Sequence, residues 1–130
     1  LAADGVLFAS FITLTAGLNY YYDLCPEGLL NEPAMDLFDR MERDETWSGM
    51  AFTQATFINS REVLPFFEEL GFEKIALAGQ EGLAGPRLTY IENAEKAVRD
   101  LYLQLSLRVC ENPQYFAYSD HLLYVGSPKK

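Results

Sequence analysis

The sequence predicts an α/β fold built on about three β-strands, with flanking helices and a helical insertion. Three observations predict it: an apolar run at 5–13 (GVLFASFIT), a helical pattern followed at once by an apolar run over 59–79, and a last apolar run at 121–126 (HLLYVG). Alternation of strand and helix patterns is typical of sheets that are covered by helices. A chain of 130 residues is long enough for one domain with a hydrophobic core.

The composition favours a soluble globular protein and excludes several partners. Hydrophobic residues make up 49% and charged residues 22% of the chain, and the formal net charge is −9. An acidic surface repels phosphate backbones, so we expect no nucleic acid partner. We also expect no membrane partner, because no apolar run reaches the roughly 20 residues that span a bilayer.

The cysteines and the single histidine bear on compartment and metal binding. Cys25 and Cys110 lie far apart and form no CxxC pair, which favours two reduced thiols in a cytoplasmic protein. The segment 1–15 lacks the basic region of a signal peptide, which agrees with that compartment. With one histidine, no metal site is predicted.

The first predicted element is the run Gly5 to Thr13, which reads as a buried parallel strand. Asp4-Gly5 supplies the turn before it, and the run has almost no polar interruption. Such a strand needs neighbours on both edges and cover on both faces. Because the sequence offers candidates for one side only, we expect a partial domain over 1–130, the C-terminal part of a larger sheet.

The next segment, 14–58, is predicted to be a lid-like insertion after the first strand. It is punctuated by Gly and Pro and rich in aromatic residues. Within it, 33–43 is expected to form a short amphipathic helix and 51–58 a short extended stretch. Long connections with such contents usually cover a ligand site.

A helix and a strand are predicted next, over 59–79. Asn59 is a suitable N-cap, and Glu62 completes a capping-box pattern. The expected buried stripe consists of Val63, Phe66, Phe67 and Leu70. Gly71 then ends the helix in a left-handed conformation, and Phe72 to Gly79 forms the strand.

The segment 82–118 is predicted to be a helical insertion before the last strand. Thr89 to Cys110 carries the longest helical pattern, with Thr89 and Glu92 as a second capping box. Its expected buried stripe consists of Ile91, Ala94, Val98, Leu101 and Leu105. The last strand is His121 to Gly126.

Three stretches in this order resemble the C-terminal half of a class I S-adenosylmethionine-dependent methyltransferase of the bacterial small-molecule type. They are LAADG at 1–5, SREVLPFFEELGFEKI at 60–75 and HLLYVG at 121–126. The resemblance implies a Rossmann-like sheet in which 5–13 is the fifth strand, 72–79 the sixth, and 121–126 the seventh, which is antiparallel.

The resemblance also implies the cofactor S-adenosylmethionine and a small-molecule methyl acceptor. The family binds the donor mainly through a glycine-rich loop in its first half, and no GxGxG run occurs here. We therefore assign no cofactor-binding residue, and we expect this fragment alone to be inactive and not to bind the donor usefully.

Ligands of open α/β sheets bind at the carboxyl ends of the parallel strands. In this chain that rim is expected to include the ends of 5–13 and 72–79 and the start of the antiparallel last strand. The predicted substrate-binding residues are Thr13, Tyr20, Tyr21, Trp47, Phe52, Phe57 and His121.

Each of these residues also has an ordinary structural interpretation. His121 can cap or flank a strand, Trp47 can serve packing alone, and the run 20–22 cannot point all its rings one way. The related sequences often carry an Asn-Arg pair where this chain has Thr13-Leu14. No catalytic residue is assigned, because positioning can supply much of the acceleration of methyl transfer.

Two other functions remain open at this point. A half-sheet with an unpaired edge can serve as a non-enzymatic interaction or dimerisation module, which predicts a homo-oligomer of the fragment. A fragment of another Rossmann-like enzyme, such as a dehydrogenase, is disfavoured by an antiparallel last strand.

Overall fold

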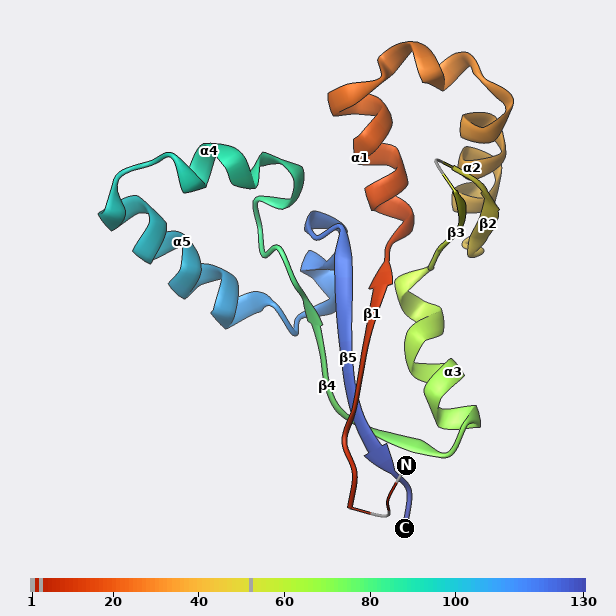
Figure 1. Ribbon diagram of the computed structural model, residues 1–130, viewed down its shortest axis with the longest axis vertical. Helices are drawn as coiled ribbons and strands as arrows, with labels where there is room; N and C mark the ends of the chain where they lie inside the picture. The colour runs from red at the N-terminus through yellow and green to blue at the C-terminus, as the bar shows by residue number, and fades with distance from the viewer. Residues whose placement is uncertain (1, 3, 52) are drawn as a thin grey trace.

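A three-stranded sheet forms the centre of the molecule (Figure 1). The computed structural model describes residues 2, 4–51 and 53–130. The strand order is β1 (Leu7–Ile12), β5 (His121–Pro128), β4 (Phe72–Gly79), and β5 pairs antiparallel with both neighbours. β1 and β4 therefore run in the same direction without touching. The mixed α/β class and the antiparallel direction of the last strand, both predicted from the sequence, are confirmed.

Helix α3 (Val63–Glu69) covers one face of this sheet (Figure 1). The ring of Phe67 stacks on that of Tyr124, with the centroids 3.7 Å apart and the planes 6° from parallel. Phe67 also meets Phe11 of β1 and Phe72 of β4 edge to face. The buried members of this core are Val63, Phe67, Leu77, Phe116, Leu122 and Tyr124.

The opposite face of β1 is open. Leu7, Ala9 and Phe11 pack on the core, whereas Phe8 points away from it and is 66% exposed. Cover on both faces was expected, so this expectation is not met within the described residues. The sequence predicts a parallel strand with neighbours on both edges, and this is wrong for the described residues: β1 is an edge strand whose one strand neighbour in the sheet, β5, runs antiparallel, while Ile58 bonds to Ile12 at the end of its other edge.

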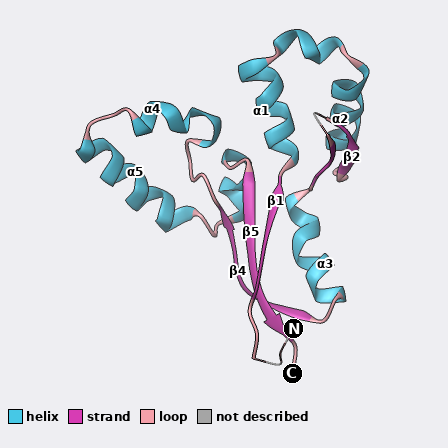
Figure 2. Ribbon diagram, in the orientation of Figure 1, coloured by secondary structure: helices cyan, strands magenta, loops and turns pink. Residues whose placement is uncertain are grey.

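The insertion between Ile12 and Ile58 is more ordered than the sequence predicts. It contains α1 (Leu14–Leu24), a 3₁₀ turn (Pro26–Leu30), α2 (Glu32–Glu42), and a hairpin of β2 (Trp47–Met50) with β3 (Gln54–Phe57), gathered beyond one end of the sheet (Figure 2). The helix expected at 33–43 corresponds to α2, whereas α1 and β2 were not predicted. The backbone N–H of Ile58 donates to the carbonyl of Ile12, 2.8 Å away, so the insertion leaves and rejoins the sheet at one place.

The helix predicted from Asn59 forms, but its N-terminus differs from a capping box. Asn59 accepts from the N–H of Arg61 at the start of the 3₁₀ turn Ser60–Glu62. Glu62 turns away and accepts from the hydroxyl of Thr46 at 2.8 Å. Thr46 Oγ1 in turn accepts from the Asn59 N–H at 2.9 Å, so the contact joins α3 to the insertion.

The predicted stripe on α3 is half correct. Val63 and Phe67 are buried, whereas Phe66 and Leu70 are 50% and 57% exposed. The helix is short and ends at Glu69, and the φ of +79° at Gly71, just after the C-cap Leu70, confirms the predicted left-handed glycine. A helix of two turns presents one narrow stripe to the sheet, so its second apolar row stays in solvent.

The single helix predicted over 89–110 is wrong. The chain forms α4 (Leu88–Glu92) and α5 (Lys96–Val109), separated by a break at 93–95, with a 3₁₀ helix at Pro113–Tyr118. Glu95, in place of Thr89, stands at the N-cap of the longer helix. The apolar side chains expected to be buried on α5 are exposed: Val98, Leu101 and Leu105.

Among the described residues, no helix combines the length and the apolar character needed to cross a bilayer.

Candidate functional site

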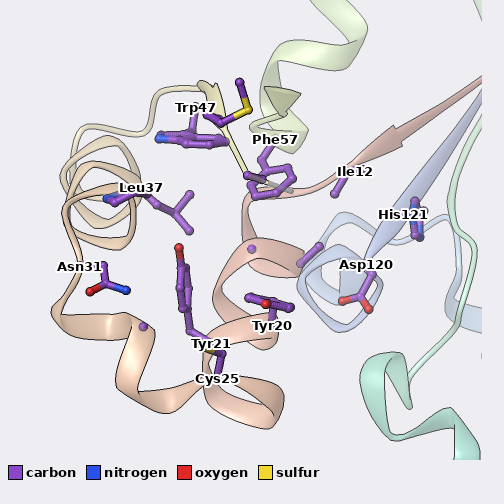
Figure 3. Close-up of a pocket in the computed structure, with 16 residues that line it drawn as sticks. Ile12, Tyr20, Tyr21, Cys25, Asn31, Leu37, Trp47, Phe57, Asp120 and His121 are labelled. Atoms are coloured by element: carbon purple, nitrogen blue, oxygen red, sulfur yellow. The ribbon is translucent and has the colours of Figure 1, made fainter. Parts of the chain in front are cut away.

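A cavity of about 640 Å³ lies where the insertion meets the rim of the sheet (Figure 3). Its walls come from the end of β1 (Ile12), the first residue of β5 (His121) and Asp120 just before it, helices α1 and α2, and the β2–β3 hairpin. This volume is within the range of small-molecule sites. The cavity has an aromatic end inside the insertion and a polar end at the sheet.

The aromatic end is built around Trp47. This side chain is 4% exposed, and its ring lies 5.1 Å from that of Phe57 on the facing strand of the hairpin. Its indole Nε1 donates to Oδ2 of Asp36 on α2, 2.7 Å away, so the ring is fixed from both sides. Leu14 and Leu37 complete this small second core.

Gly17 lets α1 approach this wall closely. A Cβ at this position would stand 2.7 Å from Cδ2 of Phe57 and 2.9 Å from Cδ2 of Leu37. Both distances are too short for carbon atoms, so a side chain here would push Phe57 and Leu37 away. Gly17, one of the glycines that punctuate the predicted insertion, is therefore required for the close packing of a helix.

Two of the three consecutive tyrosines of α1 line the cavity. Tyr20 and Tyr21 both do so, with their rings edge to face at 5.6 Å, while Tyr22 faces solvent. The pKa of Tyr21 is raised, first by burial of its phenol, then by the charges of Tyr20 and Cys25. The neutral phenol of Tyr21 is thus the form that the cavity favours.

The polar end is lined by the carboxylate of Asp120 and the imidazole of His121, and Glu81 contacts His121 from behind. Nδ1 of His121 lies 2.5 Å from Oε1 of Glu81, and the backbone N–H of His121 donates to Oε2 at 2.9 Å. Asp120 accepts from Nδ2 of Asn19 at 3.0 Å. These groups stand where β1 and β4 finish and β5 begins, which is the rim that the sequence indicated.

The structure brings five of the seven predicted site residues together around the cavity: Tyr20, Tyr21, Trp47, Phe57 and His121. Thr13 is buried beside it and caps α1, with Oγ1 accepting from the Ala16 N–H and donating to the carbonyl of Ser119. Phe52 lies outside the described residues.

The acidic part of the site lies on the rim that the sequence indicated, but neither Glu81 nor Asp120 was named there as a site residue. Asp120 lines the cavity, and Glu81 holds His121 from behind. One signal could have found Glu81: it follows the end of one strand while His121 begins the next antiparallel one, so the pairing of β4 with β5 brings the two together. The contributions of Cys25, Asn31 and Met50 depend on how the insertion folds and carry no pattern in the sequence.

The lining of the cavity is of a kind that suits a small aromatic molecule. Aromatic faces suit a flat apolar body, and the polar groups at one end suit a hydroxyl or amine. A nucleoside donor would need backbone N–H groups from a glycine-rich turn, and the sequence contains no GxGxG run.

Among the described residues, no group of three or more His, Cys, Asp or Glu side chains is placed to hold a metal ion.

No protein-family model matches this sequence, and no curated protein matches it.

Proposed function

We propose that this chain is the substrate-side portion of an S-adenosylmethionine-dependent methyltransferase that acts on a small molecule. In this proposal the Rossmann-like sheet is larger than the three strands seen here, and β1, β4 and β5 are its fifth, sixth and seventh strands. The cavity described above then holds the methyl acceptor. The isolated fragment is inactive because the residues that bind the donor lie elsewhere.

The observation that carries the proposal is the position of the cavity. It lies at the carboxyl end of β1, on the same rim as the end of β4, where open α/β sheets bind their ligands. The insertion 14–58 supplies most of its apolar wall, as a substrate-covering segment should. The placement of Tyr20, Tyr21, Trp47, Phe57 and His121 around it supports the assignment of the acceptor site.

The direction of the last strand supports the methyltransferase over a dehydrogenase. β5 runs antiparallel to β1 and β4, as the resemblance implies for a seventh strand, whereas dehydrogenase sheets of this type are usually parallel throughout. The open face and open edge of β1 also agree with a sheet that continues beyond this chain, since an apolar strand normally has cover.

The residues of this chain have limited roles in that reaction. The donor supplies an electrophilic methyl group, and the aromatic wall orients the acceptor. The buried Trp47 keeps water from the apolar end, while Asp120 and His121 meet the polar group of the acceptor.

Calorimetry with S-adenosylmethionine tests the proposal. We expect the full-length gene product that contains this sequence to bind the donor, and the 130-residue chain alone to show no useful affinity. A dissociation constant of roughly millimolar is weak for any cofactor site. If the full-length product does not bind the donor at that concentration, the proposal that it is a methyltransferase is refuted.

A second candidate function is a non-enzymatic association module. One observation favours it: β1 combines a free edge with an exposed Phe8, and strands of that kind pair readily with another chain. On this alternative the chain forms homo-oligomers through β1. The association experiment described below measures it directly.

A further inference from the structure

The histidine at the cavity is held in one orientation by a carboxylate. Oε1 of Glu81 faces Nδ1 of His121, and Oε2 accepts the backbone N–H of the same residue. Both oxygens are thus committed to His121, and the ring cannot rotate without losing the contact. A carboxylate at Nδ1 keeps a proton on that nitrogen and leaves the lone pair on Nε2.

Glu81 is itself fixed by the helical insertion. The hydroxyl of Tyr102, on α5, donates to the carbonyl of Glu81 and accepts from the N–H of Ala84 at 3.2 Å. Ser119 Oγ donates to the carbonyl of Gly82 at 3.2 Å, and the N–H of Gln80 donates to the carbonyl of His121 at 3.0 Å. The loop that carries Glu81 is therefore held by α5, by the residue before Asp120 and by β5.

His121 is open to the cavity while its partner is sheltered. The side chain of His121 is 43% exposed and that of Glu81 is 21% exposed. His121 lines the cavity, and none of the hydrogen bonds between described residues uses Nε2. The titratable groups near the imidazole are Glu81 from the β4 side, Asp120 on its own strand end and Tyr20 from α1.

We propose that Glu81 and His121 form a proton-accepting pair, with His121 as the base and Glu81 as its positioning residue, and that the cavity takes an aromatic ligand bearing a hydroxyl group. In this proposal the ligand ring lies against Trp47 and Tyr20 and its hydroxyl meets His121; Figure 3 shows these side chains around the cavity. The O–H bond breaks, the proton passes to Nε2, and the oxygen keeps the electron pair. The imidazolium so formed lies between the Glu81 carboxylate and the phenolate, which stabilises it from both sides.

This inference rests on the proposed function, in which the base prepares the acceptor: a phenolate accepts a methyl group more readily than a phenol does. Proton transfer to His121 can be tested without the methyl donor. His121 is the one histidine and Trp47 the one tryptophan in the sequence, so each gives a single, unambiguous signal.

The first test needs no ligand. Nitrogen-15 spectra of the neutral imidazole distinguish a ring protonated at Nδ1 from one protonated at Nε2. We expect the Nδ1–H form in the 130-residue chain and a shift towards the Nε2–H form in Glu81→Ala. A predominant Nε2–H form in the unaltered chain would overturn the proposal, and this measurement depends on no variant that might fail to fold.

The second test uses 4-nitrophenol, whose phenolate absorbs visible light, and 4-nitroanisole, which has the same ring without the proton. Quenching of Trp47 emission reports binding of both. The proposal predicts that the apparent pKa of bound 4-nitrophenol falls by about one unit, because the imidazolium favours the phenolate. Asp120 acts in the opposite direction, so an unchanged or raised pKa of the bound dye would overturn the proposal.

Two variants test whether the fall in the pKa of the bound dye comes from the Glu81–His121 pair. His121→Asn keeps a donor for Glu81 but has no proton-accepting nitrogen; it should lose the fall in dye pKa, a change of about tenfold in the proton equilibrium, while Trp47 quenching by 4-nitroanisole, which has no proton to lose, checks that the cavity still forms. Glu81→Gln should lose at least half of that fall. Retention of the full fall in His121→Asn would overturn the proposal. Failure of donor binding by the full-length product would refute the methyltransferase without altering these results, so the two failures are distinguishable.

Discussion

The rings of Phe67 and Tyr124 stack face to face, 3.7 Å apart, and join α3 to the central strand of the sheet. Tyr124 is 1% exposed and stands on β5, between the strands that carry Phe11 and Leu77. This contact fixes the α3-covered face, while the rim that forms the cavity lies beyond it at the strand ends. Stability of the framework and occupancy of the cavity can therefore be tested by separate substitutions.

Replacement of Phe67 by Ala should remove the centre of the main core. The free energy of unfolding is expected to fall by about 3–5 kcal/mol, the usual effect of emptying a buried aromatic position. Phe66→Ala is the matched control, because its ring is half exposed on the same helix, and it should cost less than about 1.5 kcal/mol. Urea denaturation followed by circular dichroism measures both; equal losses would show that α3 does not dock as described.

Replacement of Asp36 by Ala should loosen the aromatic end of the cavity. Nε1 of Trp47 loses its acceptor, which is expected to cost about 1–2 kcal/mol and to shift Trp47 emission to longer wavelength as water reaches the indole. Asp39→Ala removes an exposed acid from the same helix and should leave the emission unchanged. An unchanged spectrum in Asp36→Ala would contradict the contact.

Stability should fall at alkaline pH because of one buried phenol, that of Tyr124, and one partly buried phenol, that of Tyr21. The pKa of Tyr124 is raised from 10.0, first by burial and then by the charge of Glu68, and the pKa of Tyr21 is also raised by burial. The two neutral phenols stabilise the folded state fully at pH values below the tyrosine pKa of the unfolded chain. This stabilisation is lost as the pH rises through the higher pKa of the folded state, because the unfolded chain releases these protons first. Tyr124→Phe should reduce the slope of unfolding free energy against pH above about pH 10; an identical slope would exclude Tyr124 as a cause.

The free edge of β1 should cause the isolated chain to associate. Phe8 is 66% exposed on that strand, and Phe8→Lys should move the sedimentation profile towards monomer, since a charge on an edge strand opposes pairing. Leu30→Lys is the control, because Leu30 is 89% exposed in the insertion and away from β1. A monomeric unaltered chain at high concentration would contradict the association proposal.

The positions of the sheet strands were predicted well from the sequence, because they depend on patterns of neighbouring residues. The apolar runs at 72–79 and 121–126 correspond to strands Phe72–Gly79 and His121–Pro128, because short apolar runs bounded by turn residues have few alternatives. Gly71 was predicted as a left-handed cap and has a positive φ. Features of this kind depend only on neighbouring residues.

The predictions failed where tertiary contacts decide the structure. Gly17 and the tyrosines after it lower helix propensity, yet Thr13 caps α1 and the close approach of Gly17 to Phe57 favours the helix. Glu62 was expected to cap its own helix and instead binds Thr46 across the chain. Five of the predicted site residues line the cavity. The sequence indicated the rim on which Glu81 and Asp120 stand, but the contact of Glu81 with His121 depends on the pairing of β4 with β5.

The most direct test of the acceptor site is methyl transfer by the full-length gene product, followed by mass spectrometry of a hydroxylated aromatic compound that quenches Trp47. Tyr20 lines the cavity and its neighbour Tyr22 does not, although their exposures are similar at 54% and 59%. We predict a methylated product, a KM for the acceptor raised about five- to tenfold in Tyr20→Ala, and an unchanged KM in Tyr22→Ala. No methyl transfer to compounds that bind the cavity, or equal KM values in the two variants, would contradict the assignment of this cavity as the acceptor site.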